Sequence, residues 1–232
     1  MIIKVCGMRD AENIRAISSL GVDMVGLIFW PQSPRYVRMI NSRSGIIPDK
    51  AGEGVVETGV AKPKLVGVFV DELPQNIVTR VYNYNLDYVQ LHGNESPTMI
   101  DNLRRTLDPD IRPGIKIIKA ISVASADDVE RCRDYEGLVD MFLFDTRTPQ
   151  VGGSGEQFDW SVLEAYKGNT PFLLSGGIGP DDAERVLSFS HPQLAGIDIN
   201  SRFETESGIK DVAKVGEFVV RLTSRRVDKL TS

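Results

Sequence analysis

Eight short apolar runs, each followed by a stretch with helical spacing, constrain the fold of this chain more than any other feature. The runs are continuous rather than alternating, which is typical of parallel strands buried on both faces. They span residues 2–5, 24–29, 65–70, 88–91, 115–121, 141–144, 171–174 and 195–199. Alternating strands and helices form either a doubly wound sheet or a barrel. Eight units within 232 residues favour an α/β chain folded as a single (β/α)8 TIM barrel.

The segments between these runs carry apolar residues at helical spacing, and two of them begin with capping residues. Asp10 and Ser96 are residue types that accept hydrogen bonds at a helix N-terminus, and Pro97 suits a first helical turn. Helices are predicted over residues 10–20, 73–84, 96–107, 125–135, 160–166, 181–189 and 212–222.

The connection between the second and third strands departs from this pattern. Residues 41–64 hold four glycines and two prolines with poor helical spacing, so we expect an elaborated segment there. No stretch rich in Pro, Gly and Ser divides the chain, and one domain over residues 1–232 is therefore expected.

Composition excludes several classes of function. A net charge of −5 gives little attraction to nucleic acid or to an anionic membrane, although a small anionic ligand remains possible. No apolar run approaches the roughly 20 residues of a membrane span, and the N-terminus lacks the features of a secretory signal. Cys6 and Cys132 are expected to be reduced thiols, which favours the cytoplasm. With two histidines and two cysteines, no metal site is expected.

A glycine cluster follows the seventh predicted strand. In a barrel the active site lies in the loops after the strands, and those after strands seven and eight commonly bind phosphate. Glycines in residues 175–179 allow backbone N–H groups to approach an anion. The alternative is a tight turn that needs glycine only for its dihedral angles. A second glycine-rich loop, residues 152–155, is a further source of N–H donors or a lid.

Cys6 and Asp145 end the first and sixth predicted strands, and closure of a barrel brings those ends to opposite sides of one cavity. A thiolate and a protonated carboxyl group facing each other can act as base and acid. Cys6 then needs nearby positive charge, for which Arg9 is a candidate, and Asp145 needs a raised pKa. The alternatives are a small buried apolar residue and a capping residue. Cys132, within a predicted helix, is expected to be structural.

Other polar residues follow the second, third and fourth strands. Arg35 lies in a proline-bounded loop, where a guanidinium can hold a carboxylate through two hydrogen bonds, unless it is simply solvated. His92 is either catalytic or a hydrogen-bonded histidine at the rim. Asp71 is expected to line the cavity or to cap the third helix.

Several of these residues lie within motifs that occur in order along the chain. The motifs are residues 4–9 (KVCGMR), 26–29 (GLIF), 33–35 (SPR), 89–93 (VQLHG), 143–146 (LFDT), 152–155 (GGSG), 174–178 (LSGGI) and 196–201 (GIDINS). Together they resemble the phosphoribosylanthranilate isomerase family of tryptophan biosynthesis, from about residue 2 to residue 211. The resemblance implies an Amadori rearrangement of N-(5-phosphoribosyl)anthranilate to 1-(2-carboxyphenylamino)-1-deoxyribulose 5-phosphate, without cofactor or metal.

The resemblance also implies residue roles. Asp145 matches the general acid that protonates the ring oxygen, Cys6 the general base that removes the C2 proton, and Arg35 the contact to the anthranilate. The phosphate is expected on backbone N–H groups of Gly153, Ser154, Gly176, Gly177, Asn200 and Ser201. The family commonly has glycine after the serine that matches Ser201, whereas this chain has Arg202, which is a candidate charge contact. The segment 41–64 is also longer than the family leads us to expect.

Two alternative functions remain at this point. A related phosphosugar barrel, such as indoleglycerol-phosphate synthase, would need strand-borne lysine and glutamate catalysts, and Lys119 is the one suggestive lysine. A catalytically silent phosphosugar-binding barrel would keep the glycines but lose the acid or the base, and both Cys6 and Asp145 are present. The only expected partner is a small phosphosugar substrate, and the chain is expected to be a monomer.

Overall fold

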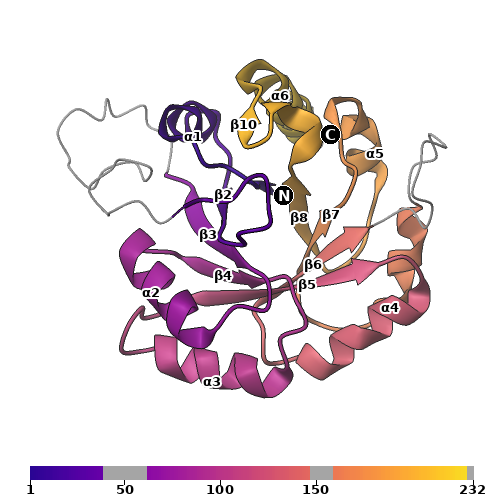
Figure 1. Ribbon diagram of the computed structural model, residues 1–232. Coiled ribbons are helices and arrows are strands. Elements are labelled where there is room, and N and C mark those ends of the chain that lie inside the picture. The colour runs from indigo at the N-terminus through magenta and orange to yellow at the C-terminus, as the bar shows by residue number, and fades with distance from the viewer. Residues whose placement is uncertain (39–61, 147–158, 229–232) are drawn as a thin grey trace.

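The predicted barrel is present in the computed structural model, which describes residues 1–38, 62–146 and 159–228 (Figure 1). Eight parallel strands pair in chain order, and the first closes the ring by pairing with the eighth. They are β1 (Ile2–Val5), β2 (Met24–Ile28), β3 (Lys64–Phe69), β4 (Tyr88–Leu91), β5 (Lys116–Val123), β6 (Met141–Thr146), β7 (Phe172–Ser175) and β8 (Leu194–Ile199). Every strand begins and ends within two residues of its predicted bounds. The predicted segment 41–64 lies largely outside the described residues.

Helices surround the ring of strands (Figure 1). They are α1 (Ala11–Ser18), α2 (Pro74–Tyr84), α3 (Pro97–Leu107), α4 (Ala126–Glu130), α5 (Ala183–Ser188) and α6 (Val212–Asp228). The predicted caps are confirmed, because Asp10 accepts a hydrogen bond from the Asn13 N–H and Ser96 accepts one from the Met99 N–H. These side chains satisfy N–H groups that have no partner within the helix.

Three predicted helices are wholly or partly 3₁₀ rather than α. Short 3₁₀ helices are η1 (Arg131–Tyr135), η2 (Trp160–Ala165) and η3 (Pro180–Asp182). A 3₁₀ helix places residues i and i+3 on one face, and the buried side chains of η2, Trp160 and Leu163, have this spacing. The sequence pattern is consistent with either geometry over so few residues.

A small antiparallel hairpin after β8 was not predicted. It joins β9 (Glu204–Glu206) to β10 (Ile209–Lys210), after a 3₁₀ turn, η4 (Ser201–Phe203). Strands of three and two residues are too short to produce a recognisable alternating pattern. The hairpin brings Glu204 and Lys210 to the C-terminal ends of the barrel strands, next to β1.

The strands are buried on both faces, as their continuous apolar runs indicate. Most buried apolar residues lie between the barrel and the helices, whereas a second cluster that includes Val66, Ile118 and Leu173 fills the barrel interior. Side chains two residues apart along a strand share a face. The interior therefore becomes polar toward the C-terminal ends of the strands, where Lys4, Cys6, Gln90, Asp145, Ser175 and Asp198 follow the apolar layer.

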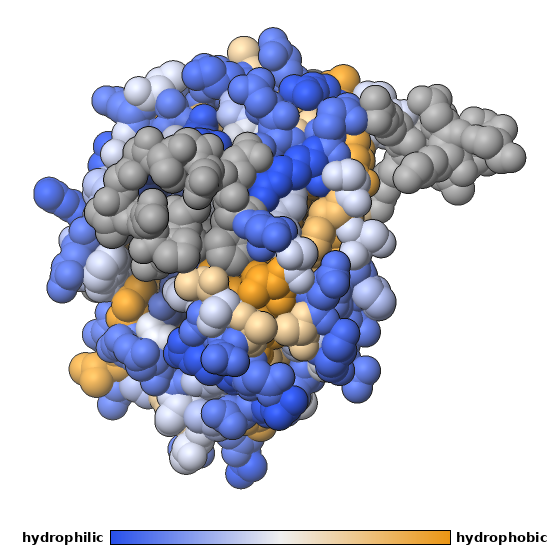
Figure 2. All heavy atoms as spheres, turned by 90° about the vertical axis from the view of Figure 1, so that its right-hand side faces the viewer, coloured by the Kyte–Doolittle hydropathy of each residue, from blue (hydrophilic) through white to orange (hydrophobic). Residues whose placement is uncertain are grey.

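The outer surface is mostly polar. Figure 2 shows one side of the molecule, where hydrophilic residues cover most of the surface and hydrophobic residues gather near the middle. Within the described residues, the large apolar side chains that are exposed lie at α2 and α6; they are Leu73, Tyr82, Val212 and Val220. The described part of the chain contains no helix that is long and apolar enough to cross a membrane.

Candidate active site

Cys6 lies at the C-terminal end of β1 above two buried charged residues. Its backbone N–H donates to the Ile199 carbonyl, which fixes the residue against β8, and its side chain is buried. Lys4, two residues earlier on the same face, is fully buried and its Nζ is 2.8 Å from Oδ1 of Asp198. Oδ2 of Asp198 accepts a hydrogen bond of 3.3 Å from the Ser175 hydroxyl. The Lys4–Asp198 ion pair therefore lies next to the thiol, deeper in the barrel interior.

The electrostatic surroundings of the thiol act in opposite directions. Burial raises the pKa of Cys6 above its ordinary value, and the ammonium groups of Lys4 and Lys210 oppose this rise. Burial by itself would lower the pKa of Lys4, but Asp198 and Cys6 hold it above its ordinary value, so the ammonium stays charged. Arg9, the cation suggested by the sequence, donates instead to the Pro34 carbonyl.

A second ion cluster lies beside Cys6 and is built largely by the hairpin. Glu204 accepts two hydrogen bonds from Arg35, from Nε at 2.7 Å and from Nη2 at 2.6 Å. Lys210 Nζ lies 2.6 Å from the same carboxylate and 2.8 Å from Oδ1 of Asn200. Burial raises the pKa of Glu204, but the bonds from Arg35 and Lys210 outweigh burial and hold it below its ordinary value. The loop arginine is therefore fixed rather than solvated.

The two clusters together leave one positive charge unbalanced around the thiol. They contain three cations, Lys4, Arg35 and Lys210, and two carboxylates, Asp198 and Glu204. In a poorly solvated site an excess cation favours a nearby anion. Either a Cys6 thiolate or the carboxylate of a bound ligand can supply that anion. The Glu204 pair uses two of the five N–H donors of the Arg35 guanidinium.

Two glycines make room for this arrangement. A Cβ at Gly26 on β2 would lie 2.8 Å from the Cys6 sulfur. A Cβ at Gly7 would lie 2.5 Å from Cδ of Arg35 and 2.7 Å from Oδ1 of Asn200, and Gly7 has a φ of +75° that glycine adopts without strain. Both motifs quoted from the sequence, KVCGMR and GLIF, thus contain a glycine that the site requires.

The acid candidate Asp145 lies at the end of β6, three strands from β1 around the ring. Its Oδ2 is 3.5 Å from Nε2 of His92, at the end of β4. Nδ1 of His92 is in turn 3.1 Å from Nε2 of Gln90. His92 is therefore a histidine hydrogen-bonded to Gln90, and its other ring nitrogen lies close to the candidate acid.

The loops after β7 and β8 carry four of the predicted phosphate residues. Gly176 and Gly177 have φ values of +96° and +67°, which favour glycine. Asn200 and Ser201 follow β8 directly. Arg202 donates from Nη1 to the Gly177 carbonyl at 3.0 Å, so its side chain links the two loops. Two further predicted phosphate residues, Gly153 and Ser154, lie outside the described residues.

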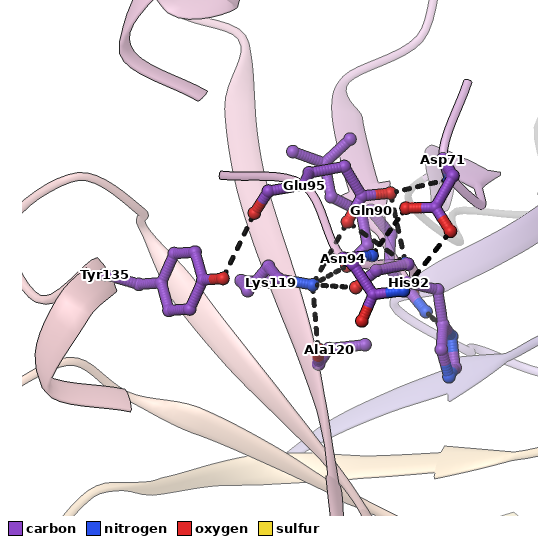
Figure 3. Close-up of polar contacts among 10 residues, drawn as sticks. Asp71, Gln90, His92, Asn94, Glu95, Lys119, Ala120 and Tyr135 are labelled. Carbon is purple, nitrogen blue, oxygen red and sulfur yellow. Dashed lines mark hydrogen bonds and ion pairs between the residues drawn. The ribbon is translucent and has the colours of Figure 1, made fainter. Parts of the chain in front are cut away.

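Lys119 points away from the barrel interior. Its neighbours Ile118 and Ala120 belong to the interior cluster, so Lys119 lies on the opposite face of β5. Its Nζ is 3.1 Å from Oε2 of Glu95, and both side chains are 2% exposed (Figure 3). A lysine in this ion pair has no access to a substrate in the cavity, which argues against a lysine-dependent synthase.

Asp71 does not cap α2, whose N-cap is Leu73. Asp71 has a φ of 47°, and its Oδ1 accepts a 2.6 Å hydrogen bond from the Asn94 N–H, which links the β3 and β4 loops. Cys132 is buried in η1, as a structural role predicts, and burial raises its pKa to about 12. Among the described residues, no group of His, Cys, Asp and Glu is arranged to hold a metal ion.

Comparison with known proteins identifies the family of this chain. A family model described as N-(5'-phosphoribosyl)anthranilate isomerase matches residues 3–221. The chain belongs to the phosphoribosylanthranilate isomerase family. A curated phosphoribosylanthranilate isomerase from Parabacteroides distasonis is 44% identical over 228 residues, covering 98% of this chain and 96% of the relative. The one from Phocaeicola vulgatus is 43% identical over 225 residues, covering 97% and 99%.

Solved phosphoribosylanthranilate isomerases share the architecture. The crystal structure of the Thermotoga maritima enzyme superposes with a TM-score of 0.74 at 30% identity, covering 97% of this chain and all of that one. A complex of a phosphoribosylanthranilate isomerase with reduced 1-(o-carboxyphenylamino)-1-deoxyribulose 5-phosphate gives a TM-score of 0.74 at 26% identity, with the same coverage. The resemblance noted in the sequence is thereby confirmed.

Sequence reasoning missed four residues that this isomerase places around Cys6: Lys4, Asp198, Glu204 and Lys210. One signal was available, because a lysine inside the otherwise apolar first strand requires a buried partner. Asp198 lies within β8, and its side chain is paired with Lys4. Nothing in the local pattern indicated Glu204 or Lys210, since the hairpin that carries them was not predicted.

Proposed function

We propose that this chain converts N-(5-phosphoribosyl)anthranilate to 1-(2-carboxyphenylamino)-1-deoxyribulose 5-phosphate, with Asp145 as general acid and Cys6 as general base. The observation that carries these roles is the placement of the two side chains. They lie at the ends of β6 and β1, three strands apart around the ring, and both follow the interior face of their strands. A ring between them would present its oxygen to one residue and a carbon-bound proton to the other.

The reaction then proceeds in two proton transfers. Asp145 donates a proton to the furanose ring oxygen as the C1–O bond breaks, and the anthranilate nitrogen forms a protonated Schiff base with C1. The Cys6 thiolate removes the proton from C2, and its electron pair moves to give the enolamine. Tautomerisation of the enolamine yields the ketone. The positive charge of Lys4 and Lys210 opposes the burial that raises the pKa of Cys6, and so reduces the cost of forming the thiolate that this second step needs.

Binding uses the two loop systems already described. Arg35 would contact the anthranilate carboxylate through N–H donors that Glu204 does not use. The phosphate would bind to backbone N–H groups of Gly176, Gly177, Asn200 and Ser201, together with Gly153 and Ser154. The positive φ values of the β7 glycines support this placement, because such backbone turns N–H groups toward an anion.

The test is a fluorescence assay that follows the loss of freshly generated phosphoribosylanthranilate. Wild type should turn over, whereas Cys6→Ser and Asp145→Asn should each lose about 10²-fold or more, since general acid or base catalysis contributes roughly 10²–10⁴-fold. Either variant with near-wild-type turnover would remove its residue from the proposed role. A folded wild type without turnover would indicate a silent binding barrel.

The remaining features of the proposal concern the whole chain. We propose that it acts as a cytoplasmic monomer of one domain over residues 1–232, without cofactor, metal, nucleic-acid or membrane partner. One relative, from Thermotoga maritima, is described as dimeric, with monomers obtained from it. Light scattering at micromolar concentration distinguishes the two states for this chain. Full activity after dialysis against a chelator would support the metal-free reaction.

A further inference from the structure

His92 connects the candidate acid to a buried amide. Its Nε2 is 3.5 Å from Oδ2 of Asp145, and its Nδ1 is 3.1 Å from Nε2 of Gln90. Gln90 comes from β4 and is 1% exposed, whereas His92 and Asp145 are partly open to the cavity. The three side chains thus form a line from the barrel interior to the acid.

The orientation of the Gln90 amide in this structure, with Nε2 toward His92, selects the ring nitrogen of His92 that carries the proton. An amide nitrogen can only donate, so the Gln90 NH₂ group requires Nδ1 of His92 to accept. In the neutral ring the proton then lies on Nε2, the nitrogen that faces Asp145. An N–H directed at one oxygen of a carboxyl group restricts the rotation of that group.

The loop that carries His92 is fastened on both sides of it. Lys119 Nζ donates to the carbonyl groups of Leu91, at 3.3 Å, and Gly93, at 2.7 Å (Figure 3). The Glu95 carboxylate accepts hydrogen bonds from the N–H groups of Gly93 and Asp71. In Figure 3 the imidazole lies on the side of this turn away from Tyr135. A buried ion pair therefore fixes the backbone from which the imidazole projects.

We propose that His92 is a positioning residue for the general acid: its Nε2–H holds the carboxyl group of Asp145 in the direction needed to protonate the ring oxygen, and Gln90 holds the imidazole in the required tautomer. This rests on the proposed role of Asp145. His92 itself transfers no proton to substrate in this arrangement, and its effect reaches the reaction only through Asp145.

The kinetic test compares two replacements of His92. A glutamine amide can place an N–H donor near the position of Nε2, whereas alanine cannot. We expect His92→Ala to lower kcat by about tenfold to 100-fold with KM changed less than threefold, and His92→Gln to recover part of the loss. In an Asp145→Asn background, His92→Ala should lower the residual turnover by less than twofold. Equal losses in both backgrounds would overturn the proposal, because His92 would then act independently of Asp145.

A spectroscopic test does not depend on turnover. The chain has two histidines, so ¹⁵N-histidine labelling gives two ring spin systems, and His191→Gln assigns them. We expect His92 to be protonated on Nε2 and unprotonated on Nδ1. Gln90→Met should remove this preference, and Asp145→Asn should shift the Nε2 resonance of His92 but not that of His191. A ring protonated on Nδ1 in wild type would overturn the proposal.

The two experiments separate this inference from the proposed function. If Asp145→Asn keeps wild-type turnover, the acid assignment fails whatever the tautomer of His92. If Asp145→Asn is inactive while His92→Ala keeps wild-type kcat, Asp145 remains the acid and only the positioning role is lost. His191→Gln is the matched control for both, since His191 contacts the backbone of Tyr166 and Gln193 far from β4.

Discussion

At the scale of single residues, the chemistry of the site depends on how closely side chains approach Cys6. The thiol sits where β1, β2 and β8 meet, and each neighbour contributes something different: space from Gly26, charge from Lys4 and a backbone hydrogen bond from Ile199. Because the thiol is buried, small displacements change both its reach and its ionisation.

Gly26→Ala tests the requirement for space. The added Cβ would lie 2.8 Å from the Cys6 sulfur and 3.1 Å from its Cα, so the thiol must move. Misplacement of a catalytic group by about 1 Å can cost up to about 100-fold, and we expect kcat to fall at least about tenfold. Gly216→Ala on α6 is the control, since its Cβ would make an ordinary 3.5 Å contact with Leu20. Unchanged kcat in Gly26→Ala would mean that the thiol position is not critical.

Lys210→Met tests the requirement for charge. Lys210 opposes the burial that raises the pKa of Cys6, so its removal should raise this pKa further. The thiolate fraction then falls at any given pH, and alkylation of Cys6 by iodoacetamide should reach its half-maximal rate at a higher pH than in wild type. Cys132, whose pKa is about 12, serves as the unreactive internal control. An unshifted profile would show that Lys210 does not act on the thiol.

At the scale of elements, two charged side chains link the loops at the C-terminal ends of the strands. The Lys119–Glu95 pair fastens the β4 loop, and Arg202 bridges the β7 and β8 loops. The Lys119–Glu95 pair is buried, whereas the Arg202 side chain is more than half exposed. We therefore expect the loss of Lys119 to have the larger energetic effect.

Lys119→Met should destabilise the fold. It leaves the Glu95 carboxylate buried without its cation, which costs about 3–5 kcal/mol in the free energy of unfolding. Adding Glu95→Gln should restore part of the lost free energy of unfolding, because no uncompensated buried charge then remains. Urea unfolding of the two variants gives the comparison. A double variant as unstable as the single one would show that the lysine acts through its backbone contacts alone.

Arg202→Gly tests the departure of this chain from its family. Arg202 lies more than half exposed beside the Gly177 carbonyl, so a charge contact to a bound phosphate would be partly screened by solvent. We expect KM to rise about fivefold, corresponding to roughly 1 kcal/mol, with kcat nearly unchanged. Lys214→Gly, on the exposed start of α6, is the matched loss of a cation. A lower KM in Arg202→Gly would mean that glycine lets the backbone approach the phosphate more closely.

At the scale of the whole molecule, a closed ring of strands is expected to unfold as one unit. The two tryptophans report on different parts of the ring, because Trp30 follows β2 and Trp160 begins η2 after β6. In Trp30→Phe and in Trp160→Phe, urea unfolding followed by fluorescence and by circular dichroism should have the same midpoint. Different midpoints within one variant would show that part of the barrel unfolds separately.

The fold was predictable because the same pattern, an apolar strand followed by a helix, repeats along the chain. The site was predictable only in part. Buried parallel strands need continuous apolar runs, and all eight were visible. Cys6 and Asp145 were proposed from the sequence because polar residues at strand ends stand out. The charged residues around Cys6 were not predicted, because Lys4 and Asp198 are 194 residues apart in sequence and pair only when the barrel closes. The contact between His92 and Asp145 likewise joins ends of different strands that no local pattern relates.

Because β1 pairs with β8, the ring of strands can close only after β8 has been synthesised. The strands on the acid side, β4 to β6, leave the ribosome well before Asp198, Glu204 and Lys210 are synthesised. Cys6 precedes these three charged residues by about 190–200 positions, and pairing so distant in sequence is slow. A nascent chain therefore carries its thiol without Asp198, Glu204 and Lys210 for most of its synthesis, and the site is completed only when β8 and the β9–β10 hairpin dock beside β1.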